Sequence, residues 1–195
     1  MRYMAAKTAR EAAEALAAEK GVTRVLAGGT DVLVQMKSGL VEPDLLVDIK
    51  KIPGIADITA EAGGFRIGAA VANAALGEHA GVVALWPGVV EGANLIGSTQ
   101  VQGRCTMVGN LCNASPAGDA VPGLAAANAV ARIAGPDGEI VDPRRADLAQ
   151  QHGDAVDEGL ATDDADFRVT GGHVYHVLAA AEADLQPDRA LIAKD

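Results

Sequence analysis

The sequence is poor in aromatic residues, in cysteines and in basic charge, and it has no long apolar run. Five of the 195 residues are aromatic, so a core has to be built from Val, Leu, Ile and Ala. Two cysteines cannot form the disulfide framework of a small secreted domain. No stretch reaches the roughly 20 apolar residues of a membrane-spanning helix, so we expect no membrane span.

The charge is acidic and unevenly distributed. The formal net charge is −10, which argues against a nucleic-acid partner. Residues 1–138 hold 13 acidic and 11 basic residues, a net of −2, whereas residues 139–195 hold 13 acidic and 5 basic residues, a net of −8. The amino-terminal segment lacks the apolar stretch of a secretory signal. We therefore expect a cytoplasmic protein with Cys105 and Cys112 as thiols.

The first third of the chain predicts a parallel βαβ unit. Residues 8–20 read as a helix with Thr8 as its cap. Residues 22–27 are a short apolar strand, residues 31–37 have helical character, and residues 45–49 form a second continuous apolar strand. Strands separated in this way by a helix are typical of a parallel sheet.

The pattern changes after Pro53. The expected elements are strands over 55–59 and 65–67, helices over 73–79 (capped by Asn73), 82–93 and 119–128, a strand over 129–134 and a last helix over 174–183. Residues 94–118 show little periodicity and are rich in Gly, Ser, Asn and Thr.

Two glycine-rich segments are candidate binding loops. The first joins the strand over 22–27 to the following helix, where glycine lets the backbone approach an anion and the next N–H groups can bind it. Its residues are Leu26, Ala27, Gly28, Gly29, Thr30, Asp31, Val32 and Leu33. The spacing matches neither G-x-G-x-x-G nor the P-loop. A plain chain-reversing turn remains the alternative.

The second segment runs from Cys105 to Asp119. Its hydroxyl and carboxylate groups suit the hydroxyls of a sugar or ribityl chain, and a loop of this length in a compact domain is typically functional. A surface loop rich in turn-forming residues is the alternative. Two such loops, both beginning a helix, favour a large ligand that carries phosphate groups.

Metal and catalytic constellations are not apparent. Cys105 and Cys112 have no Cys-x-x-Cys spacing, so an iron–sulfur site is not expected. His173 and His176 lack a further ligand in metal spacing. We predict no metal site and assign no catalytic residue.

Three separated motifs carry a resemblance to a known family. They are LAGGTDVLVQMKSGLVEPDLLVDIKKIPGI, IGAAVANAALGEHAGV and IGSTQVQGRCTMVGNLCNASPAGDAVPGL. In this order and spacing they resemble the FAD-binding (medium) subunit of the molybdenum hydroxylases, the xanthine dehydrogenase and carbon monoxide dehydrogenase family. The resemblance extends from about Tyr3 to Gly138.

The resemblance implies a fold and a set of flavin contacts. The fold class would be α+β, of the p-cresol methylhydroxylase (vanillyl-alcohol oxidase) type, with a βαβ lobe over residues 1–55, a second FAD-binding lobe with a mainly antiparallel sheet over 56–138, and an atypical acidic tail over 139–195. The pyrophosphate would be held by the first loop, Leu26 to Leu33, and by Thr106, Val108, Gly109 and Asn110. Asp119 would contact ribityl or ribose hydroxyls, and Ile96 and Gly97 would lie against the adenine end.

The resemblance also implies a role in electron transfer. The chain would be an FAD-dependent oxidoreductase subunit beside an iron–sulfur subunit and a molybdopterin-binding subunit. Electrons would pass from the clusters through FAD to NAD⁺ or another acceptor. Two alternatives stay open: a non-catalytic remnant that keeps the fold without functional flavin, and a stand-alone flavoprotein reductase.

The sequence departs from the family in two places. Where the family commonly has the motif T-I-G-G-N, this chain has T-M-V-G-N, so Val108 stands in place of a glycine. If that position required a positive φ, a β-branched residue would be strained by roughly 1–3 kcal/mol. Residues 139–195 do not show the family's further C-terminal domain, which indicates a truncated or diverged member.

Overall fold

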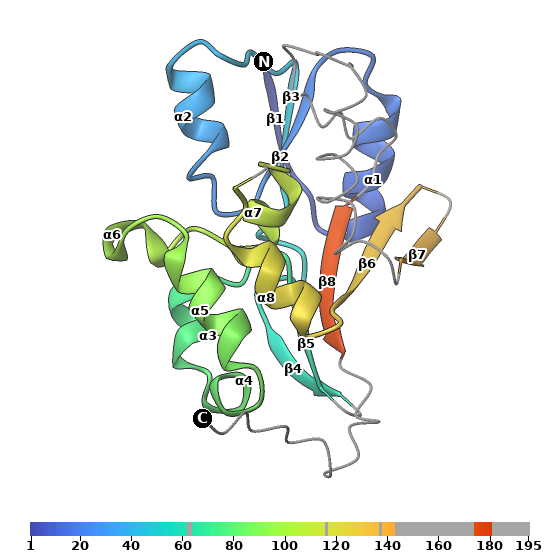
Figure 1. Cartoon of the computed structure of the whole chain (residues 1–195). Coiled ribbons are helices and arrows are strands. Elements are labelled where there is room, and N and C mark those ends of the chain that lie inside the picture. Colours follow the sequence, from blue (N-terminus) through green and yellow to red (C-terminus); the bar gives the residue numbers. More distant parts are fainter. Residues whose placement is uncertain (62–63, 116, 137, 143–173, 181–195) are drawn as a thin grey trace, which may run out of the picture.

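The structure is a computed structural model that describes residues 1–61, 64–115, 117–136, 138–142 and 174–180. Its strands form two sheets, one of three strands near the amino terminus and one of five strands (Figure 1). The small sheet and the helices beside it correspond to the predicted βαβ unit. The larger sheet and a group of short helices make up the second part.

The three-stranded sheet is entirely parallel. Its strands are β1 (Arg2–Ala5), β2 (Thr23–Leu26) and β3 (Leu45–Asp48), in the order β1-β3-β2. The central strand β3 is buried at all four positions, as the continuous apolar pattern predicted. Sequence reasoning missed β1, because the amino-terminal segment reads as charged and helical. All three carboxyl ends therefore lie at the same edge of the sheet.

Two helices connect these strands. Helix α1 (Ala9–Ala18) begins as predicted, because the Thr8 hydroxyl accepts a hydrogen bond of 3.0 Å from the Glu11 N–H. It buries a stripe that includes Ala12 and Leu16 against the sheet. Helix α2 (Val32–Lys37) buries none of its side chains.

The five-stranded sheet is antiparallel throughout. Its strands are β4 (Ile58–Glu61), β5 (Gly64–Ile67), β6 (Val130–Gly135), β7 (Gly138–Asp142) and β8 (Val174–Ala180), in the order β4-β5-β8-β6-β7. The predicted helix over 174–183 is wrong, because residues 174–180 form a strand that pairs with β5 on one side and β6 on the other. The remainder of that prediction, 181–183, lies outside the described residues. Segment 139–195 thus contributes strand β8 and most of β7 to this sheet.

Within the described residues, short helices connect β5 to β6, and most of them lie beside the larger sheet (Figure 1). They are α3 (Asn73–Glu78), α4 (Ala80–Leu85), α5 (Pro87–Leu95), α6 (Thr99–Gln102), α7 (Met107–Cys112) and α8 (Ala120–Ala126). The single helix predicted over 82–93 is wrong, because α4 ends before Trp86 and a separate helix, α5, begins at Pro87. Residues 94–118, which show little periodicity in the sequence, contain α6 and α7.

One apolar cluster joins the two parts of the fold. Val47 and Ile49 from the small sheet belong to the same cluster as Ile67, Met107 and Leu124 from the second part. The members are almost all Ala, Val, Leu and Ile, as the scarcity of aromatic residues predicted. Among the described residues, no helix is long and apolar enough to cross a membrane.

Candidate functional site

The first glycine loop lies at the carboxyl edge of the parallel sheet, directly after β2. Gly29 has a φ of +80°, which an L-amino acid side chain disfavours. Within the described part of the chain, the backbone N–H groups of residues 28–32 donate to no protein acceptor. Five successive backbone donors are therefore available to a ligand at this edge.

The two candidate loops are in direct contact. A Cβ atom on Gly28 would lie 2.0 Å from the carbonyl oxygen of Arg104 and 3.1 Å from the Cα atom of Cys105. Only a residue without a side chain permits this approach. The loops are therefore brought together although 76 residues separate Gly28 from Arg104.

Helix α7 begins immediately after that contact. The Thr106 hydroxyl caps it by accepting a hydrogen bond of 2.9 Å from the Gly109 N–H, and the Asn110 N–H donates to the Thr106 carbonyl at 3.0 Å. The N–H groups of Gly109 and Asn110, which were expected to bind a pyrophosphate, are thus already hydrogen-bonded to Thr106.

Val108 is not strained. It is a helical residue in α7, and its φ is not among the positive values of the described residues. Its side chain is buried in the core cluster together with that of Met107. The strain considered for this glycine-to-valine departure is therefore absent, and the valine anchors the start of α7 in the core.

Asn73 positions the second loop through hydrogen bonds to Cys105, a role that the sequence did not predict. The expected helix cap is wrong, because Ala72 occupies the cap position and Asn73 is fully buried. Its Nδ2 donates to the Ala93 carbonyl at 2.8 Å and to the Cys105 sulfur at 3.3 Å. Its backbone N–H donates to the Cys105 carbonyl at 2.9 Å. One side chain thereby connects α3, α5 and Cys105, which lies two residues before α7.

The remaining predicted site residues lie close to Cys105 and Asn110. The Cys105 thiol donates to the Ile96 carbonyl at 3.6 Å, and Gly97 follows with a φ of +67°. The Asn110 Oδ1 accepts a hydrogen bond of 3.2 Å from the Ala120 N–H, which places the exposed Asp119 beside α7. Thus the structure brings the Gly28 loop, the Ile96 turn, α7 and Asp119 together through contacts with Cys105 and Asn110.

Both cysteines are thiols, as predicted. Burial raises the pKa of the Cys105 thiol, and the negative charge of Asp31 on the first loop raises it further, against a lowering by the Asn73 amide. The thiol is therefore neutral at physiological pH and acts as a hydrogen-bonding core residue. Within the described segments, no group of His, Cys, Asp and Glu could hold a metal ion.

A second feature that sequence reasoning missed is an ionic network beside the first loop. The Tyr3 hydroxyl donates to Asp48 Oδ2 at 2.7 Å. Lys50 pairs with Asp48 Oδ1 at 2.8 Å and also donates to the Ala27 carbonyl at 3.2 Å. Burial alone would raise the pKa of Asp48, but the hydrogen bonds from Lys50 and Tyr3 outweigh it and lower that pKa. The hydrogen bond to Asp48 raises the pKa of Tyr3.

This network predicts a pH dependence of stability. Because the pKa of Asp48 is lower in the folded chain than its ordinary 3.8, its stabilising contribution is present above pH 4 and is lost as the pH falls further. Asp48→Asn should therefore destabilise the protein at pH 7, and the difference from wild type should shrink toward pH 3. Urea unfolding at both pH values measures this. The exposed Asp57→Asn is the control, and a difference that stays constant with pH would contradict the assignment.

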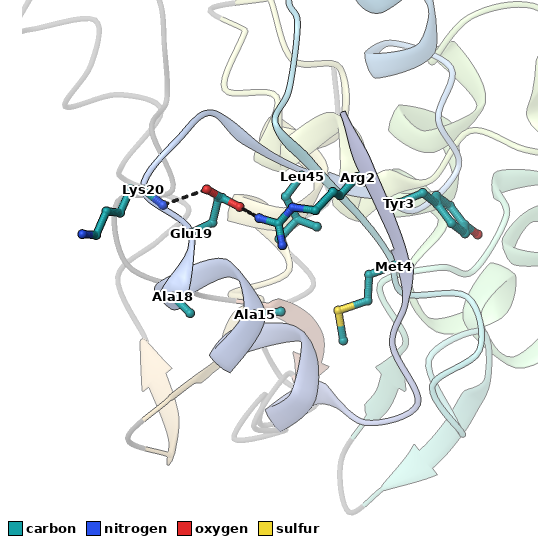
Figure 2. Close-up of a pocket in the computed structure, with 8 residues that line it drawn as sticks. All are labelled: Arg2, Tyr3, Met4, Ala15, Ala18, Glu19, Lys20 and Leu45. Carbon is teal, nitrogen blue, oxygen red and sulfur yellow. Dashed lines mark hydrogen bonds and ion pairs between the residues drawn. The ribbon is translucent and has the colours of Figure 1, made fainter.

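A separate cavity lies at the opposite end of the small sheet. It has a volume of about 640 Å³ and is lined by residues that include Arg2, Met4, Ala15 and Leu45. Figure 2 shows Arg2 pointing toward Glu19 across it, whereas the Tyr3 side chain points away. Arg2 and Leu45 begin β1 and β3, and Ala15 and Glu19 come from the carboxyl-terminal part of α1 and the residue after it, away from the carboxyl edge where parallel sheets bind ligands. The cavity is therefore distinct from the meeting point of the two loops.

Comparison with known proteins identifies what this site resembles. The sequence matches the family described as FAD binding domain in molybdopterin dehydrogenase over residues 1–156. The nicotinate dehydrogenase FAD-subunit of Eubacterium barkeri is 31% identical over 123 residues, which are 63% of this chain and 42% of that protein. The carbon monoxide dehydrogenase medium chain of Hydrogenophaga pseudoflava is 33% identical over 117 residues, 60% of this chain and 41% of that one.

Similar solved structures lead to the same family as the sequence comparison. A carbon monoxide dehydrogenase structure from Hydrogenophaga pseudoflava superposes with a TM-score of 0.69 at 31% identity, covering 72% of this chain and 49% of that chain. Quinoline 2-oxidoreductase from Pseudomonas putida 86 gives 0.68 at 25% identity, covering 73% and 50%. The chain thus spans between two fifths and half of the length of these relatives. Because the family match covers most of its length, the chain belongs to the FAD-binding domain family of the molybdopterin dehydrogenases.

Proposed function

We propose that the chain binds FAD where the Gly28 loop meets the start of α7 and serves as the flavin-binding electron-transfer subunit of a molybdenum-containing dehydrogenase. The observation that carries this proposal is the run of available N–H groups over residues 28–32, placed against Arg104 and Cys105 by a contact that only glycine allows. A pyrophosphate needs several convergent backbone donors and a backbone that approaches closely, and the loop supplies both.

The described residues are suited to hold FAD, and each would have a distinct part in binding it. The N–H groups of the first loop would bind the pyrophosphate, together with the Val108 N–H at the second position of α7. The exposed Asp119 carboxylate would accept hydrogen bonds from ribityl or ribose hydroxyls. The positive-φ turn at Gly97 would lie along the adenine end. Such an arrangement would suit an FAD-binding fold of the p-cresol methylhydroxylase type.

The names of the relatives support the wider role. They are described as a FAD-subunit and as a medium chain of dehydrogenases. By analogy this chain would work beside an iron–sulfur subunit and a molybdopterin-binding subunit, with NAD⁺ as one candidate electron acceptor. Bound FAD supplies the redox chemistry, accepting and passing on electrons. The chain's own residues would bind the dinucleotide and orient it, and none of them is assigned a proton transfer.

Titration with FAD tests the proposal. Adding the purified chain to FAD should change the flavin fluorescence saturably, with one FAD bound per chain. Riboflavin lacks both phosphates, so it should bind at least about tenfold more weakly, because hydrogen bonds to charged groups contribute about 1.5–3 kcal/mol each. Fluorescence titration of both ligands against the same protein preparation measures the ratio.

The outcome also separates the alternatives. A folded chain that changes the fluorescence of neither ligand is a remnant that keeps the fold without functional flavin. Equal affinity for FAD and riboflavin would contradict the pyrophosphate site. A chain that binds FAD and oxidises NADH with an artificial acceptor, in the absence of other subunits, would be a stand-alone reductase.

A further inference from the structure

Lys50 occupies an unusual position for a surface lysine. It lies two residues beyond the end of β3, at the carboxyl edge of the parallel sheet. Its ammonium group is bonded both to Asp48 Oδ1, at 2.8 Å, and to the carbonyl oxygen of Ala27, at 3.2 Å. Ala27 is the residue immediately before Gly28. The lysine therefore contacts the first peptide group of the proposed pyrophosphate loop.

Asp48 fixes the lysine in this place. Its two carboxylate oxygens are both used, one by the Tyr3 hydroxyl at 2.7 Å and the other by Lys50, through the ammonium group and through the backbone N–H at 3.0 Å. The Asp48 side chain is 10% exposed and the Lys50 side chain is 40% exposed, so the contacts are anchored on the buried carboxylate. Lysine side chains on a surface usually sample many rotamers, whereas this one has one bonding partner at the end of β3 and another just after β2.

The contact with Ala27 determines the direction of the next N–H group. The carbonyl of Ala27 and the N–H of Gly28 belong to one peptide plane, and the described peptide bonds are all trans. In a trans peptide these two groups point in opposite directions. With the carbonyl directed at the ammonium group, the Gly28 N–H is directed away from Lys50. Within the described segments it donates to no protein acceptor.

The cation also strengthens that donor. A hydrogen bond to the carbonyl oxygen polarises the peptide group, which makes its N–H a better donor, and the effect is larger when the partner is charged. We propose that Lys50 is a positioning residue for the dinucleotide: it fixes and polarises the Ala27–Gly28 peptide so that the Gly28 N–H binds the FAD pyrophosphate. This role rests on the proposed FAD site, and Asp48 and Tyr3 act through Lys50.

The neighbouring lysine provides a matched control. Lys51 carries the same charge one residue further along and is exposed. Among the interactions within the described residues, its ammonium group makes none. Lys50→Met and Lys51→Met therefore remove the same charge from nearly the same place, and only the first removes the contact with Ala27.

The test measures FAD and riboflavin affinity of both variants by flavin fluorescence. Lys50→Met should weaken FAD binding about tenfold, corresponding to one charge-assisted hydrogen bond, and change riboflavin binding less than about twofold. Lys51→Met should change neither by more than about twofold. Lys50→Arg, which keeps a cationic donor, should restore most of the FAD affinity. Equal weakening of both ligands, or equal effects of the two methionine variants, would overturn the inference.

A second readout needs no flavin. The amide ¹H and ¹⁵N chemical shifts of Gly28 in the ligand-free protein should move in Lys50→Met and stay unchanged in Lys51→Met, because only Lys50 polarises that peptide. Unchanged Gly28 shifts in Lys50→Met would overturn the inference even if FAD binding fell. Failure of the wild-type chain to bind FAD, with Gly28 still responding to Lys50, would instead overturn the proposed function and leave the peptide contact established.

Discussion

Gly28→Ala is expected to weaken FAD binding by about a hundredfold or more and to destabilise the fold. The added methyl carbon would lie 2.0 Å from the Arg104 carbonyl oxygen, and 3.1 Å from the Cys105 Cα atom. These are backbone atoms, and the Cys105 carbonyl is itself bonded to the Asn73 N–H, so the neighbour cannot swing aside as a flexible side chain would. The two loops have to separate, and the convergent donors separate with them.

The expected magnitudes follow from that separation. Overpacking in a close-packed region destabilises by about 1–3 kcal/mol. A displacement of about 1 Å at a site of convergent hydrogen bonds weakens each of them, so FAD affinity should fall by about a hundredfold or more. Thermal unfolding measures the first effect, and fluorescence titration with FAD measures the second.

Gly103→Ala is the matched control for this prediction. Gly103 is also a loop glycine near the second segment, its φ is −70°, and nothing lies within 4 Å of the added Cβ. It should leave both the melting temperature and the FAD affinity nearly unchanged. An FAD affinity of Gly28→Ala equal to that of Gly103→Ala would show that the contact between the loops does not hold the flavin site.

The local parts of this site could be predicted from the sequence. An apolar strand, a pair of glycines and a helical segment in succession are a short-range pattern, and the structure has β2, the Gly29 turn and α2 in that order. The Thr8 cap is likewise encoded by neighbouring residues. In each case the atoms that determine the geometry belong to residues a few positions apart.

The contacts that assemble the site are not local, and the sequence gives no signal for them. Nothing near Asn73 indicates that its amide bonds Ala93 and Cys105, so an asparagine before a helical stretch reads as a cap. Lys50 resembles any solvated lysine until Ala27 is placed beside it. The run at 174–180 has an ambiguous period, and its strand conformation depends on pairing with β5 and β6.

Asn73→Ala is expected to be strongly destabilising, because Asn73 is fully buried and its amide bonds two separate segments. Its removal leaves the Ala93 carbonyl and the Cys105 sulfur without that donor and opens a cavity where α3, α5 and the second loop meet. An unsatisfied buried group costs about 1–3 kcal/mol. With the cavity added, we expect a loss of about 2–4 kcal/mol and a melting temperature lower by about 5–15 °C.

The control for Asn73 is Asn94→Ala, which truncates an exposed asparagine on α5, next to the Ala93 carbonyl that Asn73 bonds. It should shift the melting temperature by no more than about 1–2 °C. Comparing Asn73→Ala with Asn94→Ala also distinguishes an effect on stability from an effect on flavin binding. At a temperature where Asn73→Ala is still folded, its FAD affinity should fall, because the Asn73 amide no longer holds Cys105 and the start of α7. An unchanged FAD affinity together with the lower melting temperature would make Asn73 a core residue with no part in positioning the second loop.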